Sequence, residues 1–181
     1  MRFERICLSF LIFSIAACGR SAENSRSIQN SEPNDADPAL RETTLSTLGG
    51  TASSPDGIFS VLITESTFEE EVTVVIEKLP ESTTGEPTRL TSTYRLRFEP
   101  EEIALSEGKL LQVRFALEPE TVESVGQDNI KIKYRTDTTG SLDNELISRL
   151  EENRVWATTR VLFADFGLIN DAASSGTCEC D

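Results

Sequence analysis

Short runs in which apolar and polar residues alternate dominate the chain beyond residue 48. The clearest run is YRLRFE, in which Tyr94, Leu96 and Phe98 alternate with charged residues. A period of two places every second side chain on the same face of a β-strand. This run therefore predicts a strand with one buried face and one exposed face.

Other segments repeat or vary this pattern. NIKIKYR (129–135) and LLQVRFALE (110–118) alternate in the same way, whereas IFSVLI (58–63) and EVTVVIEKL (71–79) are rich in β-branched residues and predict more fully buried strands. RVWATTRVLFADFGLI (154–169) predicts two strands or one long bent strand. LDNELISRLEEN (142–153) fits either a short helix or a strand with a turn.

Turn sequences separate these runs. They are SPDG (54–57), STTGEP (82–87), SEGK (106–109) and TTG (138–140). Seven or eight short strands at this spacing predict an all-β fold, namely an antiparallel β-sandwich over residues 48–169.

The first residues predict a cleaved signal. Arg2 and Arg5 precede ICLSFLIFSIAA (6–17), an apolar run too short for a membrane-spanning helix, which needs about 20 residues. The sequence that follows, Ile15-Ala16-Ala17-Cys18, resembles the lipobox of bacterial lipoproteins. The alternative is an ordinary secretory signal in which Cys18 is incidental.

The lipobox resemblance implies that residues 1–17 are a lipoprotein signal peptide. Cys18 then becomes the first residue of the mature chain and carries a diacylglycerol thioether and an amide-linked acyl chain such as palmitate. Two or more acyl chains anchor a protein stably to a membrane. Gly19 stands where an inner-membrane retention signal has aspartate, so the resemblance favours the outer membrane of a diderm bacterium.

The stretch from 18 to 47 is polar and lacks a periodic pattern, and Pro33 and Pro38 interrupt it. This composition predicts a flexible linker between the lipidated N-terminus and the sandwich. Residues 170–181 form a predicted C-terminal tail that contains Cys178 and Cys180.

Charge and composition exclude several functions. The 31 acids outnumber the 17 bases, for a net charge of −14, and an acidic surface repels the phosphates of nucleic acid. The sequence contains no histidine, which excludes Ser-His-Asp and Cys-His catalysis and any imidazole-dependent zinc site. We therefore expect a protein that is not an enzyme, needs no cofactor or metal and does not bind nucleic acid.

A second resemblance concerns the predicted sandwich. Gly49-Gly50-Thr51, the Ser-Pro-Asp-Gly turn at 54–57 and the order of the later strands resemble a ZU5-like β-sandwich across 48–169. Some members of that family cleave their own backbone at His-Phe-Ser. The matching segment here is Leu162-Phe163-Ala164, which lacks the imidazole and the hydroxyl, so the resemblance implies no self-cleavage.

Three further features have competing interpretations. Glu69, Glu70 and Glu71 could supply carboxylates to calcium, but their spacing matches no calcium motif and favours a solvated edge. For the pair Cys178 and Cys180 a disulfide is favoured over thiolate metal binding or pairing with another chain. Trp156, the single tryptophan, is expected in the core or at its margin, with stacking against a sugar as the alternative.

These features predict a lipid-anchored cell-envelope protein whose non-catalytic β-sandwich is an interaction or structural module. Its expected partners are membrane lipid, through acylated Cys18, and an unidentified envelope protein or glycan. The alternative function is an envelope carbohydrate-binding domain or a carboxylate-dependent hydrolase, whose paired carboxylates only the fold could bring together.

Overall fold

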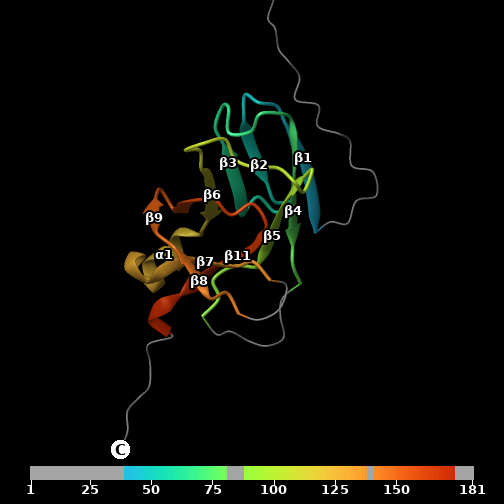
Figure 1. Cartoon of the computed structure of the whole chain (residues 1–181). Helices are drawn as coiled ribbons and strands as arrows, with labels where there is room; N and C mark the ends of the chain where they lie inside the picture. Colours follow the sequence, from blue (N-terminus) through green and yellow to red (C-terminus); the bar gives the residue numbers. More distant parts are fainter. Residues whose placement is uncertain (1–38, 81–87, 138–140, 174–181) are drawn as a thin grey trace, which may run out of the picture. The chain divides into compact units, whose positions relative to one another are not determined.

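The fold is an antiparallel β-sandwich, as the alternating pattern predicts. A computed structural model describes residues 39–80, 88–137 and 141–173. These residues form eleven strands in two sheets, and every strand pair is antiparallel (Figure 1).

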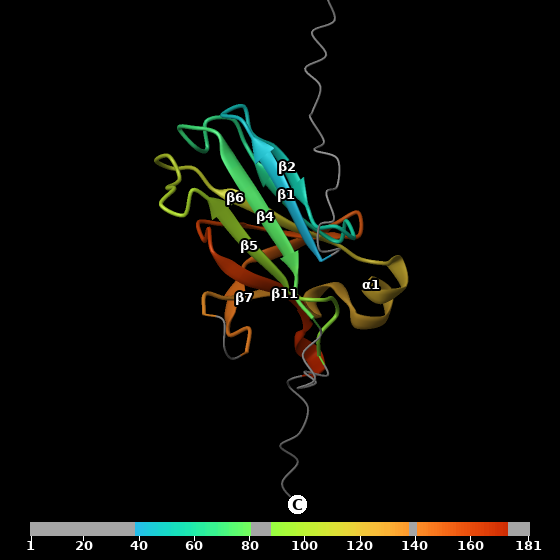
Figure 2. The same ribbon diagram turned by 90° about the vertical axis from the view of Figure 1, so that its right-hand side faces the viewer.

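The six-stranded sheet faces the viewer in Figure 2. In spatial order its strands are β1 (Leu40–Leu45), β4 (Val72–Lys78), β5 (Tyr94–Glu99), β11 (Ala164–Asn170), β7 (Ile130–Arg135) and β8 (Asn144–Leu146).

The five-stranded sheet packs behind it. Its strands are β2 (Gly50–Ser53), β3 (Phe59–Ile63), β6 (Leu111–Ala116), β10 (Arg154–Thr159) and β9 (Ser148–Glu151). The helical segments are α1 (Pro119–Val125), the 3-10 turn η1 (Gln127–Asn129) and the 3-10 turn η2 (Asp171–Ala173).

Aromatic side chains from both sheets fill the core. Phe59 of the five-stranded sheet stacks on Tyr94 of the six-stranded sheet with 5.4 Å between ring centroids, and the ring of Phe166 also stacks with Phe59, at 5.7 Å. All three residues are fully buried. Stacked and offset aromatic pairs of this kind add to the stabilisation that burial itself provides. The predicted inward positions of β5, Tyr94, Leu96 and Phe98, are therefore confirmed.

The sandwich starts earlier than predicted. Strand β1 begins at Leu40, inside the segment assigned to the linker, and pairs with β4 along its whole length, from Leu40 opposite Glu77 to Leu45 opposite Val72. The prediction that the linker extends to residue 47 is therefore wrong. The last strand, β11, ends at Asn170, one residue beyond the predicted limit of the sandwich.

The ambiguous segment 142–153 forms strands. Strands β8 and β9 are separated by Ile147 alone, and at this residue the chain passes from the six-stranded sheet to the five-stranded sheet. Ile147 is 94% exposed at this corner. A helix that was not predicted, α1, begins at Pro119, and proline is well suited to the first turn because its missing N–H has no partner there in any helix.

The strands define two ends of the sandwich. The proximal end contains the start of β1, the β2–β3 turn, the end of β4 and α1; there the backbone N–H of Lys78 donates to the carbonyl oxygen of Ala39. The distal end contains loops 46–49, 64–71, 100–110 and 160–163. The first described strand thus begins at the proximal end.

Candidate functional site

The outer face of the five-stranded sheet carries the single tryptophan. In β10, Val155, Ala157 and Thr159 are buried, so Trp156 points away from the core and is partly exposed. The prediction that Trp156 fills the core or lies at its margin is therefore wrong. The side chain contributes a large, flat apolar surface to an open sheet face instead.

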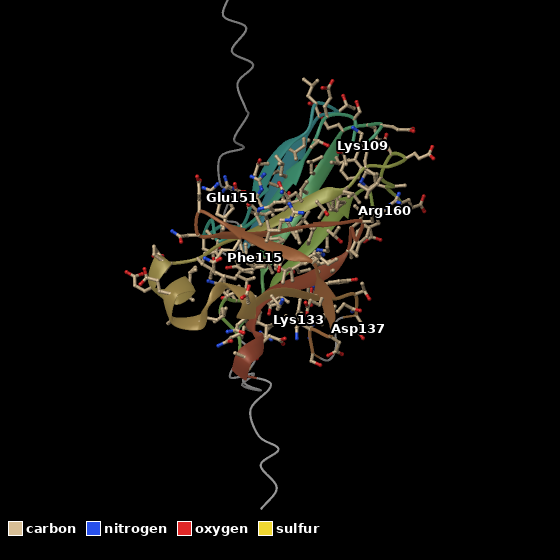
Figure 3. The ribbon with its side chains drawn as sticks, turned by 90° about the vertical axis from the view of Figure 1, so that its left-hand side faces the viewer. Lys109, Phe115, Lys133, Asp137, Glu151 and Arg160 are labelled. Atoms are coloured by element: carbon tan, nitrogen blue, oxygen red, sulfur yellow. The ribbon has the colours of Figure 1, made fainter. Side chains whose placement is uncertain are left out.

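Arginines lie on both sides of Trp156 in one row across the sheet. The antiparallel register places Arg114 of β6 opposite Trp156 on one side and Arg149 of β9 opposite it on the other. The guanidinium carbon of Arg149 is 5.5 Å from the centroid of the indole ring, within the range of a cation–π contact. Figure 3 views the molecule from the side on which β3, β6 and β9 lie in Figure 1 and labels Glu151 of β9.

We call this surface the Trp–Arg face and define it as the outward residues of β3, β6, β9 and β10. They are Ser60, Leu62, Gln112, Arg114, Ala116, Arg149, Glu151, Arg154, Trp156 and Thr158. Arg114 donates through Nε and Nη2 to the side-chain oxygen of Gln112, a neutral acceptor. Within the described part of the chain, Arg114, Arg149 and Arg154 form no ion pair.

The outer face of the six-stranded sheet has the opposite character, because acids neutralise its cations. The ion pairs are Arg95 and Arg135 with Asp165, Arg95 and Arg97 with Glu77, Lys131 with Glu145, and Lys133 with Asp171. Both faces carry basic residues at alternating positions, so the sequence pattern alone does not separate them. Only the cross-strand register shows which cations face an acid.

Asp165 is the most enclosed charge on that second face. Its side chain is 4% exposed and accepts hydrogen bonds from Arg95 at Oδ1 (2.8 Å) and from Arg135 at Oδ2 (3.0 Å). The hydrogen bond with Asp165 raises the pKa of Arg95 above its ordinary value, against the opposing effect of burial. A shallow hollow of about 150 Å³ lies beside these groups, between Arg97 and Phe163. Because its arginines already bind acids of the protein, we interpret this cluster as structural.

Asp56, in the predicted turn at 54–57, joins the two sheets at the proximal end. Its Oδ1 accepts hydrogen bonds from Ser54 Oγ (2.7 Å) and from the backbone N–H of Ile58 (3.1 Å). Its Oδ2 accepts from the hydroxyl of Tyr94 (2.8 Å) and pairs with Lys78 (3.0 Å). The turn belongs to the five-stranded sheet, whereas Tyr94 and Lys78 belong to the six-stranded sheet.

This cluster shifts two pKa values. Burial alone raises the pKa of Asp56, but the hydrogen bonds from Ser54, Lys78 and Tyr94 and from the Ile58 amide outweigh burial and lower it to about 2. Burial, followed by the hydrogen bond to Asp56, raises the pKa of Tyr94. Both shifts favour the forms present at neutral pH, an ionised Asp56 and a neutral Tyr94, and these forms make the contacts that join the two sheets.

The distal end is acidic. Glu69, Glu70 and Glu71 are exposed, as predicted for a solvated edge, and the nearby loop 100–110 adds Glu101, Glu102 and Glu107. The two loops are joined by hydrogen bonds from the Ser106 amide to the Thr67 carbonyl and from Lys109 Nζ to the Glu65 carbonyl. Within the described residues, no three acidic or cysteine side chains are grouped closely enough to hold a metal ion.

The other predicted site residues lie outside the described ranges. Cys18, the predicted lipidation site, and Cys178 and Cys180, the predicted disulfide, are all in segments that the structure does not describe. Across the described ranges, no helix has the length and apolar character required to cross a membrane. The lipid anchor and the disulfide therefore stay predictions from the sequence.

Comparison of the chain with protein-family models and with curated proteins finds no match. The fold alone therefore defines the class of this protein. It is an all-β sandwich whose six-stranded sheet has an ion-paired outer face and whose five-stranded sheet has the open Trp–Arg face. The ZU5-like resemblance stays a prediction.

Proposed function

We propose that this protein is a lipid-anchored binding or structural module of the bacterial cell envelope and that its β-sandwich is not catalytic. The observation that carries the proposal is the lipobox-like sequence Ile15-Ala16-Ala17-Cys18 directly after an apolar run of signal-peptide length. Lipidation of Cys18 would attach the mature N-terminus to a membrane, with the outer membrane favoured by Gly19.

The position of the first strand supports this arrangement. The 21 residues from 19 to 39 separate Cys18 from β1. A flexible polar chain of that length has a root-mean-square span of about 25 Å. Since β1 begins at the proximal end, we expect the tether to leave both sheet faces and the acidic distal end available to partners in the envelope.

One observation favours carbohydrate binding among the alternatives. Trp156 lies on an open sheet face, where its ring offers a flat apolar platform beside polar side chains. A carboxylate-dependent hydrolase has no comparable support. The carboxylates of Asp56 and Asp165 are already bound by hydrogen bonds and cationic side chains of the protein. We therefore retain carbohydrate binding as the second candidate.

Replacing Cys18 with serine tests the anchor. In the native host, wild-type protein is expected to incorporate labelled fatty acid and to sediment with membranes, whereas Cys18→Ser should lose both properties because no thiol remains for the thioether. Cys7→Ser is the matched control, since Cys7 lies within the predicted signal peptide, and it should be labelled like wild type. Acyl labelling that persists in Cys18→Ser would overturn the proposal.

A further inference from the structure

We propose that the Trp–Arg face binds an acidic saccharide, a sugar chain that carries carboxylate groups. In this proposal Trp156 stacks against a sugar ring, while Arg114 and Arg149 bind carboxylates on either side of it. The inference deepens the proposed function by naming the partner of the binding module. It rests on the binding part of that function and is independent of the lipid anchor.

The position of Trp156 is the first reason. Val155 and Ala157 next to it are buried in the core, and Trp156 occupies the outward position between them. A polar residue would fit such a position, as Thr158 does at the next outward position of the strand. A partly exposed tryptophan on an open sheet leaves apolar surface in contact with water. Large aromatic side chains are enriched where a partner covers such surface, and one face of a sugar ring presents the C–H groups that cover an indole.

Arginines that form no ion pair with any described residue are the second reason. The chain has 31 acids and 17 bases, yet the Trp–Arg face contains three arginines and one acid, Glu151. On the other outer face the basic residues are bound to acids. Arg114, Arg149 and Arg154 retain N–H donors that no described acid accepts. A guanidinium binds a carboxylate with two parallel hydrogen bonds, so this face is suited to an anion.

The geometry of the row is the third reason. Arg114, Trp156 and Arg149 stand opposite one another on three adjacent strands, β6, β10 and β9. Neighbouring strands are about 4.8 Å apart, so the row is about 10 Å long from Arg114 to Arg149. This length matches consecutive rings of an oligosaccharide better than a single small anion. Gln112 and Thr158, opposite each other in the next row, add an amide and a hydroxyl that can bind sugar hydroxyls.

Arg149 has a second role in this arrangement. Its guanidinium lies over the indole ring and its side chain is exposed on an edge strand. A sugar that stacks on Trp156 displaces this guanidinium from the ring. The released guanidinium then binds the carboxylate of the same or the next sugar, so the cation–π contact is exchanged for a charge-assisted hydrogen bond.

Tryptophan fluorescence offers a direct test, because Trp156 is the only tryptophan in the chain. The full chain in a neutral detergent is titrated with three carboxylated oligosaccharides: oligogalacturonate, oligomannuronate and a hyaluronan oligomer. We expect saturable quenching with a Kd below about 1 mM for at least one of them. Its carboxyl-reduced form should bind at least tenfold more weakly, and poly-glutamate should not bind at all.

Variants then locate the site. Arg149→Gln and Arg114→Gln should each weaken binding about tenfold, whereas Arg97→Gln on the opposite face should bind like wild type. Far-ultraviolet circular dichroism and thermal melting check that the variants are folded. The variant Trp156→Phe lacks indole fluorescence, so its binding is measured by calorimetry, and its affinity for the saccharide should be lower than that of wild type.

Three results would overturn the inference. The first is the absence of saturable binding to all three oligosaccharides, and the second is equal affinity of wild type and Arg149→Gln. The third is binding of poly-glutamate as tight as that of the saccharide, which would point to an acidic protein as the partner. None of these results affects acyl labelling of Cys18, so failure of this inference is distinguishable from failure of the lipid anchor.

Discussion

Removing the charge of Asp56 is expected to loosen the connection between the two sheets at the proximal end. In Asp56→Asn the amide oxygen can still accept from Ser54 Oγ and the Ile58 amide, but the amide nitrogen then faces the hydroxyl of Tyr94 and the ammonium of Lys78. The hydrogen bond from Tyr94 to a charged acceptor, 2.8 Å long, contributes about 1.5 to 3 kcal/mol. The ion pair with Lys78, whose side chain is 40% exposed, adds less than about 1 kcal/mol. We expect the free energy of unfolding to fall by about 2 kcal/mol at pH 7.

The same carboxylate makes the loss depend on pH. The pKa of Asp56 is about 2 in the folded protein, against 3.8 for an ordinary aspartate. A carboxylate with a lowered pKa stabilises the fold above the unfolded value, and this stabilisation disappears as the pH falls from about 4 to about 2. A shift of nearly two units corresponds to at most about 2.4 kcal/mol, and screening by solvent at this partly exposed side chain reduces that to about 1 to 2 kcal/mol.

Urea denaturation of the full chain, followed by the fluorescence of Trp156, measures both effects. The difference in unfolding free energy between wild type and Asp56→Asn should be about 2 kcal/mol at pH 6 and should shrink towards zero near pH 2. Asp128→Asn, which removes an exposed carboxylate, is the matched control and should stay within about 0.5 kcal/mol of wild type. In the double variant with Tyr94→Phe, the two losses should not add, because they remove the same hydrogen bond. A difference that is constant between pH 6 and pH 2 would refute the reasoning.

Two further comparisons test other parts of the fold by chemical denaturation at pH 7. Gly49 has a φ of +77°, and an added Cβ would lie 2.2 Å from the carbonyl oxygen of Ile63, whereas Gly57 has a φ of +73° with open space around it. Gly49→Ala should therefore cost about 3 kcal/mol and Gly57→Ala only about 1 to 2 kcal/mol, and equal losses would contradict this explanation. Asp165→Asn should cost about 3 kcal/mol because it leaves two guanidiniums without their carboxylate. Arg95→Gln should cost less since Arg135 still binds Asp165, and a larger loss in Arg95→Gln would show that the shared carboxylate is not the centre of the cluster.

Strands with a strong contrast between their two faces could be predicted from the sequence. In β5 and β6 every inward residue is fully buried and every outward residue is at least partly exposed. Burial of one face therefore produces a clear alternation of apolar and polar residues in the sequence. Strand β1 has no such contrast, because none of its residues is fully buried. As an edge strand it pairs with β4 alone, and backbone hydrogen bonds of this kind leave little trace in the choice of side chains.

The outward position of Trp156 could have been predicted, whereas its surroundings could not. Trp156 shares its parity with the polar residues Arg154 and Thr158, and the small or branched residues Val155 and Ala157 occupy the inward positions. This alternation indicates an outward tryptophan, although tryptophan is usually well buried. Its neighbours come from other strands. Arg114 lies 42 positions before Trp156 in the sequence, and Arg149 lies 7 positions before it. Their proximity depends on sheet order and register, which the sequence pattern does not specify.

The net charge of −14 does not oppose the binding of an acidic saccharide at the proposed site. Charges in water are screened over about 8 Å at physiological ionic strength, so the glutamates of the distal end act mainly on their own surroundings. A carboxylate at the Trp–Arg face meets three arginines and only Glu151 among the acids of that face, and local attraction therefore exceeds distant repulsion. This balance has a measurable consequence. Added salt should weaken the binding, because it screens the attraction between the saccharide carboxylates and the nearby arginines. The repulsion from distant acids is already small, so its screening has little effect. An affinity that rises with salt would show that the distant acids dominate.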